Sequence, residues 1–285
     1  MDPSLAPKIE IKDLSSKKTL RDQPWWFYAI ILIFVWAVYI FYTRENYNAA
    51  FNFIKAGISV TIKTSLISYA FALVFGLLAG LGRLSNNMFF NNLARLYVEL
   101  IRGIPMLVLI FFIALVGVPI LVDGLNAFGG WLTEIGIGFL GNPLVAFGNK
   151  SLSMNTRAIV ALSVTYGAFL AEIFRAGIQS IGRGQMEAAR SLGMSYAQAM
   201  RHIILPQAVR NVLPALGNDF VAMVKDSSLV SVLAVRDITQ VSRLYAGSTF
   251  RFREAYVTVS VMYLSMTVML SLLVQVMERR LRKND

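Results

Sequence analysis

The chain has 285 residues, of which 56% are hydrophobic and 15% are charged, and its mean hydropathy is +0.59. This composition excludes a soluble domain and indicates an integral membrane protein. The net charge of +11 does not by itself indicate nucleic-acid binding, because Lys and Arg in a membrane protein first report which segments stay in the cytoplasm. With no cysteine, the chain cannot form a disulfide framework.

Residues 1–24 are polar and carry both signs of charge, so we expect a cytoplasmic tail there. Residues 25–52 are expected to form an additional N-terminal transmembrane helix and an outer loop. The first apolar run is bulky and aromatic to its end at Phe41 and Tyr42 and lacks a small-residue cleavage site. We therefore expect a retained helix rather than a cleavable signal peptide.

Six segments are expected to cross the membrane. A hydrocarbon core of about 30 Å requires about 20 helical residues, and backbone groups in lipid must bond within their own segment. The expected spans are residues 25–42, 64–82, 103–122, 157–174, 211–235 and 256–277; the fourth contains Glu172, and the fifth contains Asp219, Lys225 and Asp226. The predicted fold class is therefore all-α, a polytopic transmembrane helical bundle.

The distribution of positive charge predicts the orientation of the bundle. With both termini in the cytoplasm, Lys and Arg are about twice as frequent in the inner segments as in the outer ones. The last outer segment, with four arginines, runs against this bias. Multi-pass insertion with a cytoplasmic N- and C-terminus is the expectation.

A glycine-rich outer segment, residues 123–156, separates the third and fourth spans. Trp131, Leu132, Ile135 and Phe139 are spaced so that a short interfacial helix is expected within it. A segment of this length is usually ordered for a purpose or disordered. It would contact an extracytoplasmic solute-binding protein or lie on the membrane, and the sequence leaves both alternatives open.

A polar, helix-forming stretch follows the fourth span, and we name residues 181–206 the docking loop. Residues 185–192 favour a helix that Gly193 ends. Ser195 and Gln198 form a capping-box pattern that starts a second helix near Tyr196, and this helix is expected to stop before Pro206. Such a hairpin would present small side chains, Ala188 and Ala189, and charged ones, Glu187 and Arg190, to a partner.

Charged residues inside spans normally face a bundle interior, a partner or a water-filled path. The candidates for a substrate pathway are Arg102, Glu172, Asp219, Lys225, Asp226, Ser227 and Ser228. Each has a structural alternative. Glu172 and Arg102 would form ion pairs or position a gate, Lys225 and Asp226 would pair with each other, and the serines would bond to their own helix. Pro214 and Gly217 are expected to interrupt the fifth span, which makes it the expected pore wall.

Four motifs give the chain a resemblance to a known family. They are Glu187-Ala188-Ala189 with Gly193, Ile203 and Leu205-Pro206; Arg102-Gly103-Ile104-Pro105; Gly167 to Gly177 (GAFLAEIFRAG); and Lys225-Asp226-Ser227-Ser228-Leu229. The first resembles the EAA signature of the membrane subunits of ABC importers. Together the motifs are similar to those of the polar amino-acid uptake permeases, the type I importers of histidine, arginine and glutamine. The resemblance covers residues 53–282.

The resemblance implies a bacterial inner-membrane permease subunit that forms half of a translocation pore. Its implied partners are cytoplasmic ABC ATPase subunits docked at Glu187, Ala188, Ala189, Arg190, Gly193, Leu205 and Pro206, a second permease subunit of the same or a related sequence, a solute-binding protein and an amino acid. The chain has no GxxxxGK[ST] loop, so ATP and Mg would be bound by the ATPase. We expect no enzyme activity, no metal site and no cofactor in the chain itself.

Two alternatives belong to other classes of membrane protein. An ion-gradient-driven amino-acid carrier would show paired inverted repeats, and the sequence shows no such repeat. A receptor or scaffold that moves no solute would be distinguished by reconstitution with an ATPase and labelled amino acids.

Overall fold

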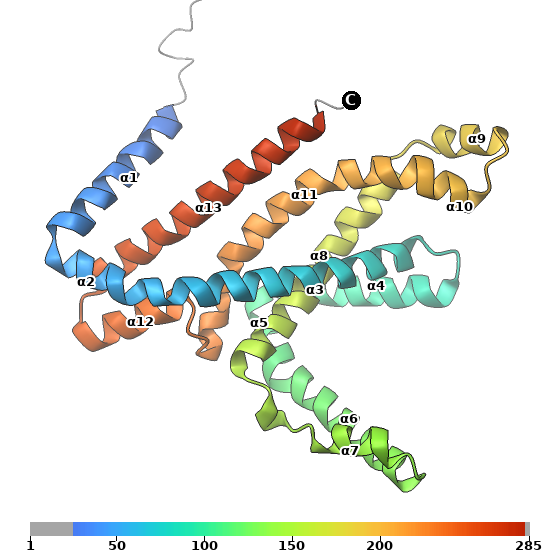
Figure 1. Ribbon diagram of the computed structural model, residues 1–285, viewed down its shortest axis with the longest axis horizontal. Coiled ribbons are helices and arrows are strands. Elements are labelled where there is room, and N and C mark those ends of the chain that lie inside the picture. Colours follow the sequence, from blue (N-terminus) through green and yellow to red (C-terminus); the bar gives the residue numbers. More distant parts are fainter. Residues whose placement is uncertain (1–24, 283–285) are drawn as a thin grey trace, which may run out of the picture.

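The computed structural model describes residues 25–282, and no strand occurs among them (Figure 1). Five helical stretches are long and apolar enough to cross a membrane: Trp25–Thr43, Glu45–Leu84, Met106–Glu134, Met154–Gln179 and Phe252–Arg280. The remaining predicted span corresponds to α11, Leu205–Asp226, which contains Arg210, Asp219, Lys225 and Asp226 among apolar residues. The all-α transmembrane bundle is thus confirmed. The tail expected at residues 1–24 lies outside the described residues.

The centre of the bundle is the contact between α3 (Ile58–Leu84) and α8 (Met154–Gln179). The buried face of α3 consists of small residues: Thr61, Thr64, Ser65, Ser68, Ala72, Gly76 and Gly80. A Cβ on Gly76 would lie 2.6 Å from the Cβ of Leu170, so the two backbones approach as closely as a glycine allows. Helices in lipid associate in this way because large apolar side chains gain nothing by leaving the bilayer.

The segment between the first two spans is helical, where the sequence suggested an outer loop. After α1 (Trp25–Thr43), α2 (Glu45–Ile54) continues through one 3-10 turn into α3. Ala50 and Ile54 of α2 are buried against Ile238 and Tyr245 of α12 (Ile238–Thr249). This tertiary contact, which local sequence does not reveal, stabilises the helix. The last helix, α13 (Phe252–Arg282), packs on α2, α11 and α12.

Most of the glycine-rich segment at 123–156 is also helical. It contains the end of α6 (Val118–Glu134) and all of α7 (Gly138–Ala146), which pack against each other. Gly136, with φ +87°, makes the turn between them. The sequence predicted one short helix here and so underestimated the helical content. The reason is that α6 begins before the glycine-rich part and continues into it.

Two prolines are each preceded by a π-helical turn. Ile113–Gly117 links α5 (Met106–Phe112) to α6 before Pro119, and Met200–Ile204 links α10 (Tyr196–Ala199) to α11 before Pro206. A proline has no N–H for the preceding turn, and a widened turn adjusts the backbone around it. The second docking-loop helix therefore does not stop before Pro206, as the sequence suggested, but continues as α11.

Arg157 is 9% exposed and binds backbone carbonyl groups. Its Nη1 donates to the Ala114 oxygen at 3.3 Å and its Nη2 to the Asn149 oxygen at 2.7 Å. Ala114 lies five residues before Pro119, which cannot supply the N–H that a π-type bond would use. The guanidinium thus satisfies a carbonyl beside the proline.

We expect Arg157→Met to destabilise the chain by about 1.5–3 kcal/mol, the usual contribution of hydrogen bonds to a charged group. Pro119→Ala should recover part of that loss in the double variant, because alanine restores a backbone N–H near the Ala114 oxygen. Thermal unfolding of the detergent-purified chain measures both effects. Equal losses with and without Pro119 would contradict the link.

Candidate functional site

The docking loop is an ordered helical hairpin. Helix α9 (Arg183–Ser191) ends at Gly193, whose φ is +84°. The Gly193 N–H donates to the Arg190 oxygen at 3.0 Å and the Met194 N–H to the Ala189 oxygen at 3.2 Å. These two bonds form a Schellman motif, which requires the left-handed backbone that glycine adopts without strain. The helix end predicted at Gly193 is confirmed.

The second helix begins as its sequence predicts. The Gln198 N–H donates to Ser195 Oγ at 3.3 Å, and the Ser195 N–H donates to Gln198 Oε1 at 2.8 Å, which completes the capping box. Because α10 passes through the π-helical turn into α11, the docking loop is joined to a span without an intervening flexible linker. The helical backbone therefore runs continuously from α10 into α11.

The exposed side of the docking loop differs from the expected one at a single alanine. Glu187, Ala188 and Arg190 are exposed, but Ala189 is 4% exposed and lies inside the hairpin. Gly193, Leu205 and Pro206 are also exposed. The expectation that both alanines face a partner was therefore wrong for Ala189, since the α9 face that carries it turns toward the hairpin's own second helix.

Two apolar side chains stand at the end of the hairpin that motif reasoning passed over. Leu192 is 84% exposed and Tyr196 is 58% exposed, one on each side of Gly193. Exposed apolar groups at a rigid tip are typical of a contact surface. Their positions, one and three residues from a helix-ending glycine, were the signal in the sequence.

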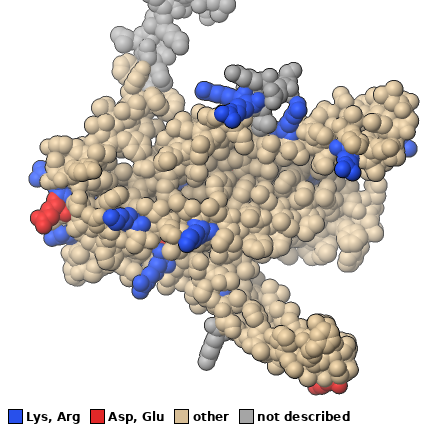
Figure 2. Space-filling model, in the orientation of Figure 1, with Lys and Arg blue, Asp and Glu red and all other residues tan. Residues whose placement is uncertain are grey.

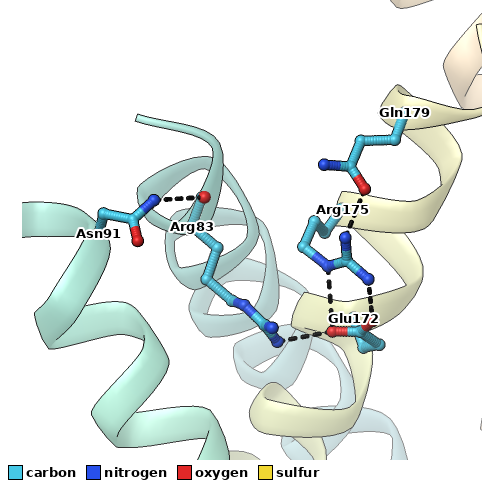
Figure 3. A network of polar contacts seen from close by, with 5 residues as sticks. All are labelled: Arg83, Asn91, Glu172, Arg175 and Gln179. Carbon is cyan, nitrogen blue, oxygen red and sulfur yellow. Dashed lines mark hydrogen bonds and ion pairs between the residues drawn. The ribbon is translucent and has the colours of Figure 1, made fainter. Parts of the chain in front are cut away.

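Glu172 forms the centre of an ion-pair network where α8 approaches the docking loop (Figure 3). Its Oε2 lies 2.6 Å from Arg83 Nη1 of α3, and its other oxygen pairs with Arg175 one turn along α8. Arg175 also bonds to Gln179, and Asn91 of α4 (Met88–Gly103) donates to the Arg83 carbonyl at 2.7 Å. One carboxylate thereby holds two arginines and ties α8 to α3, while Asn91 ties α4 to the end of α3.

Arg102, the other candidate considered for an ion pair, contacts an aromatic ring. It is exposed at the end of α4, and its guanidinium carbon lies 5.7 Å from the centre of the Phe169 ring of α8. That contact is a cation–π interaction. Sequence reasoning identified Glu172 but missed Arg83, whose distance of 89 positions along the chain hides the pairing.

Two acidic residues of α11 face tyrosines of neighbouring helices. Tyr166 Oη of α8 donates to Asp226 Oδ2 at 2.7 Å. Asp219, seven residues earlier and so on the same face of α11, lies within electrostatic range of Tyr166 and of Tyr69 on α3. Tyr69 Oη donates to the Leu216 carbonyl at 2.5 Å. The structure thus gathers two carboxyl groups and two hydroxyl groups between α3, α8 and α11.

The other predicted pathway residues near Asp226 do not all lie on the face that meets Tyr166. Lys225 is exposed and lines a cleft between α1, α11 and α13, so it faces away from the Tyr166 contact of Asp226. Ser227 is buried, and its hydroxyl donates to the Val224 carbonyl at 2.8 Å, whereas Ser228 is partly exposed. Pro214 and Gly217 were expected to interrupt this span, but α11 runs through both of them. The break comes at Ser227–Leu233, a 3-10 segment that ends at Ala234 with φ 56°.

A cleft of about 630 Å³ opens beside the docking loop, between α8, α11 and α13. Polar lining comes from Ser180, Arg210, Asn211 and Glu278, and apolar lining includes Ile173 and Val212. Asn211 Nδ2 donates to Ser180 Oγ at 2.9 Å. A cleft of mixed polarity next to charged helices can accept a zwitterion without leaving either charge unpaired.

Spanning helices that carry internal carboxyl groups, joined rigidly to a helical hairpin exposed outside them, define a membrane transport subunit. The family model of binding-protein-dependent transport system inner membrane components matches residues 72–283. The chain belongs to this family of permease subunits.

Curated relatives and solved structures agree with this assignment. A probable glutamine ABC transporter permease protein of Bacillus subtilis is 36% identical, over 82% of this chain and 95% of that protein. The glutamine transport system permease protein of Escherichia coli is 32% identical, over 79% and 91%. A crystal structure of an amino acid ABC transporter with histidines is 33% identical, with a TM-score of 0.67 over 84% of this chain and 98% of that chain.

Proposed function

We propose that the chain is the membrane-spanning permease subunit of an ATP-driven importer of polar amino acids. The relatives that support this substrate class are permeases for glutamine and other amino acids. In this proposal a separate ATPase subunit binds ATP and Mg, a second permease subunit completes the pore, and a solute-binding protein delivers the amino acid. The chain lies in a bacterial inner membrane, with both termini and the docking loop on the cytoplasmic side.

The observation that carries the proposal is the unbroken connection from the docking loop to α11. Closure of ATPase subunits around ATP would move the exposed α9–α10 hairpin, and the continuous α10–α11 helix would pass that movement to the face bearing Asp219 and Asp226. An ion-gradient carrier or a passive receptor has no use for such a lever, and no feature of residues 25–282 favours either.

Purification of the tagged chain with its bound subunits, followed by reconstitution into liposomes, tests the proposal. Uptake of labelled glutamine is expected when ATP and the binding protein are supplied on their proper sides. Uptake driven by a Na⁺ or H⁺ gradient without ATP would overturn the proposal in favour of a carrier. Binding without uptake under either condition would favour a receptor.

The Tyr166–Asp226 contact predicts how α11 serves the substrate. If Asp226 faces the path and Tyr166 orients it, Tyr166→Phe should raise the KM for uptake by about tenfold, the equivalent of one hydrogen bond to a charged group. Tyr69→Phe is the matched control, because its hydroxyl donates to the Leu216 carbonyl instead of a carboxyl group. Equal effects of the two variants would assign Tyr166 a structural role alone.

A further inference from the structure

The α6–α7 hairpin, residues 118–146, projects away from the rest of the bundle (Figure 1). Its helices contact each other extensively and meet the bundle chiefly through the turns before α6 and after α7. The outward faces of both helices therefore have no covering element in the described part of the chain. Neither membership of the permease family nor the position of the docking loop indicates whether water, lipid or protein covers these faces.

The hairpin has small residues between its helices and large apolar residues on its surface, the opposite of a water-soluble hairpin. Glycines occupy the contact between the helices: a Cβ on Gly129 would lie 2.7 Å from the Cβ of Leu144, and one on Gly141 would lie 2.2 Å from Thr133 Oγ1. Large apolar residues point outward and are exposed, namely Leu125, Phe128, Trp131, Ile135, Phe139, Leu140 and Val145. Small residues inside and large ones outside are typical of helices that pack within lipid.

Two polar side chains of the hairpin bond to its own backbone or to the residue that directly follows it. Thr133 Oγ1 donates to the Gly129 carbonyl at 2.9 Å. The Asn126 amide, in the orientation that satisfies its hydrogen bonds, donates to the Leu144 and Phe147 carbonyls at 2.7 Å. Internal pairing of this kind is required where no water can bond a free polar group.

Charge is confined to two carboxylates in this segment. Residues 118–148 contain Asp123 and Glu134 and no lysine or arginine. Asp123 accepts a hydrogen bond from Asn149 Nδ2 at 3.1 Å, and Glu134 is the last residue of α6, at the end far from the bundle. On the face that Figure 2 shows, the hairpin is uncharged except at its tip. The charge at the tip can reach the headgroup layer while the apolar faces stay in hydrocarbon, and Asp123, near the start of the hairpin, has a hydrogen-bond partner in Asn149.

The hairpin also continues a spanning helix without a break. Met106–Glu134 is one helical stretch of 29 residues, and an 18-residue window within it has a mean hydropathy of 2.7. Its exposed stripe runs from Leu107, Phe111 and Leu115 on α5 and the π-helical turn into Leu125 and Phe128. At about 1.5 Å per residue the stretch exceeds the roughly 30 Å of a hydrocarbon core, so its end reaches the interface or tilts within the bilayer. Trp131 stacks on Phe128 near this end, where interfacial aromatic residues usually lie.

From these observations we infer that the α6–α7 hairpin is embedded in the bilayer and that lipid covers its outward faces. A binding protein that docks and leaves would expose these faces to water between encounters, which a contiguous apolar surface of this kind opposes. The hairpin serves as a lateral anchor beside the entrance to α8. The proposal concerns lipid contact and does not depend on the transported substrate.

The cysteine-free chain allows a direct test by spin labelling. Single-cysteine variants Phe128→Cys and Phe139→Cys are labelled in the complete transporter in liposomes, and collision with oxygen is compared with collision with a water-soluble nickel chelate. Leu78→Cys on α3, 64% exposed, provides the lipid reference. Arg253→Cys, at a side chain 79% exposed beside α12, provides the aqueous reference.

Embedding predicts that labels at 128 and 139 collide with oxygen more than with nickel, as at Leu78. Nickel collision as frequent as at Arg253 would place the hairpin in water and overturn the inference. Labels protected from both reagents would indicate a covering protein and would also overturn it. Leu132→Cys, at a position 9% exposed between the helices, shows how such protection looks within the same hairpin.

Discussion

Replacing Gly193 by valine is expected to remove most substrate-stimulated ATP hydrolysis from the assembled transporter, while asparagine at the same position retains most of it. The backbone at Gly193 has φ +84°, which a β-branched residue strongly resists and asparagine tolerates. The cost for valine is about 1–2 kcal/mol or more, enough to lower the population of the correct turn by roughly 5- to 30-fold. The two side chains are of similar size, so the comparison isolates backbone conformation.

Steady-state ATPase activity with and without the binding protein and substrate measures this effect. Gly184→Asp is a further control, because Gly184 lies in the same loop, has open space around it and has an ordinary backbone conformation. Its new carboxylate would stand at the start of α9, where a negative charge is favourable. Full coupling in Gly193→Val, with the chain inserted normally, would show that the Schellman turn is not required for docking.

The docking loop was predictable because its signals are local. Gly193 ends α9, and Ser195 with Gln198 starts α10, through bonds between residues at most a few positions apart. The continuation past Pro206 was not predictable, because a π-helical turn has no sequence signature comparable to a proline. Pro206 predicted a helix end, because proline usually stops a helix at the preceding residue, but the widened turn before it allows the helix to continue.

The partners of the charged residues could not be derived from the sequence. Glu172 was expected to need a partner, but Arg83 and Arg102 were equally available on composition alone. The choice depends on the register of α3 against α8, which close glycine packing at Gly76 and Gly80 determines. Likewise Asp226 neighbours Lys225 in sequence, yet successive residues of a helix point in different directions, and Asp226 meets Tyr166 instead.

Helix α7 and the outward-facing aromatics of α6 show a similar limit. Glycines usually weaken a helix, and the sequence predicted only one short helix within the glycine-rich stretch. In lipid, however, glycines permit close helix contact, and that gain outweighs their low propensity. Propensity rules derived for water therefore underestimated the length of α6.

Removal of the negative charge at the centre of the α3–α8 network is expected to harm the chain more than removal of either positive charge. Glu172→Gln leaves Arg83 and Arg175 close together without a carboxylate, and the Arg83 side chain is only 15% exposed. Arg83→Gln still leaves Glu172 paired with Arg175. Because the three side chains are partly exposed, the cost of Glu172→Gln should be about 1–3 kcal/mol, below that of breaking a fully buried pair.

A double-variant cycle in detergent, read as the shift in thermal unfolding, separates these contributions. Arg83→Gln alone should cost about 1 kcal/mol or less, as for an ion pair whose remaining charge keeps a partner. In the Glu172→Gln, Arg83→Gln double variant, part of the loss from Glu172→Gln should be recovered, because one stranded arginine has been removed. Additive losses would contradict a network centred on Glu172. Arg175 and Gln179 lie where α8 leads toward α9, so transport by Glu172→Gln should decline along with its stability. A Glu172→Gln variant that is stable but no longer transports would instead assign Glu172 to the solute path.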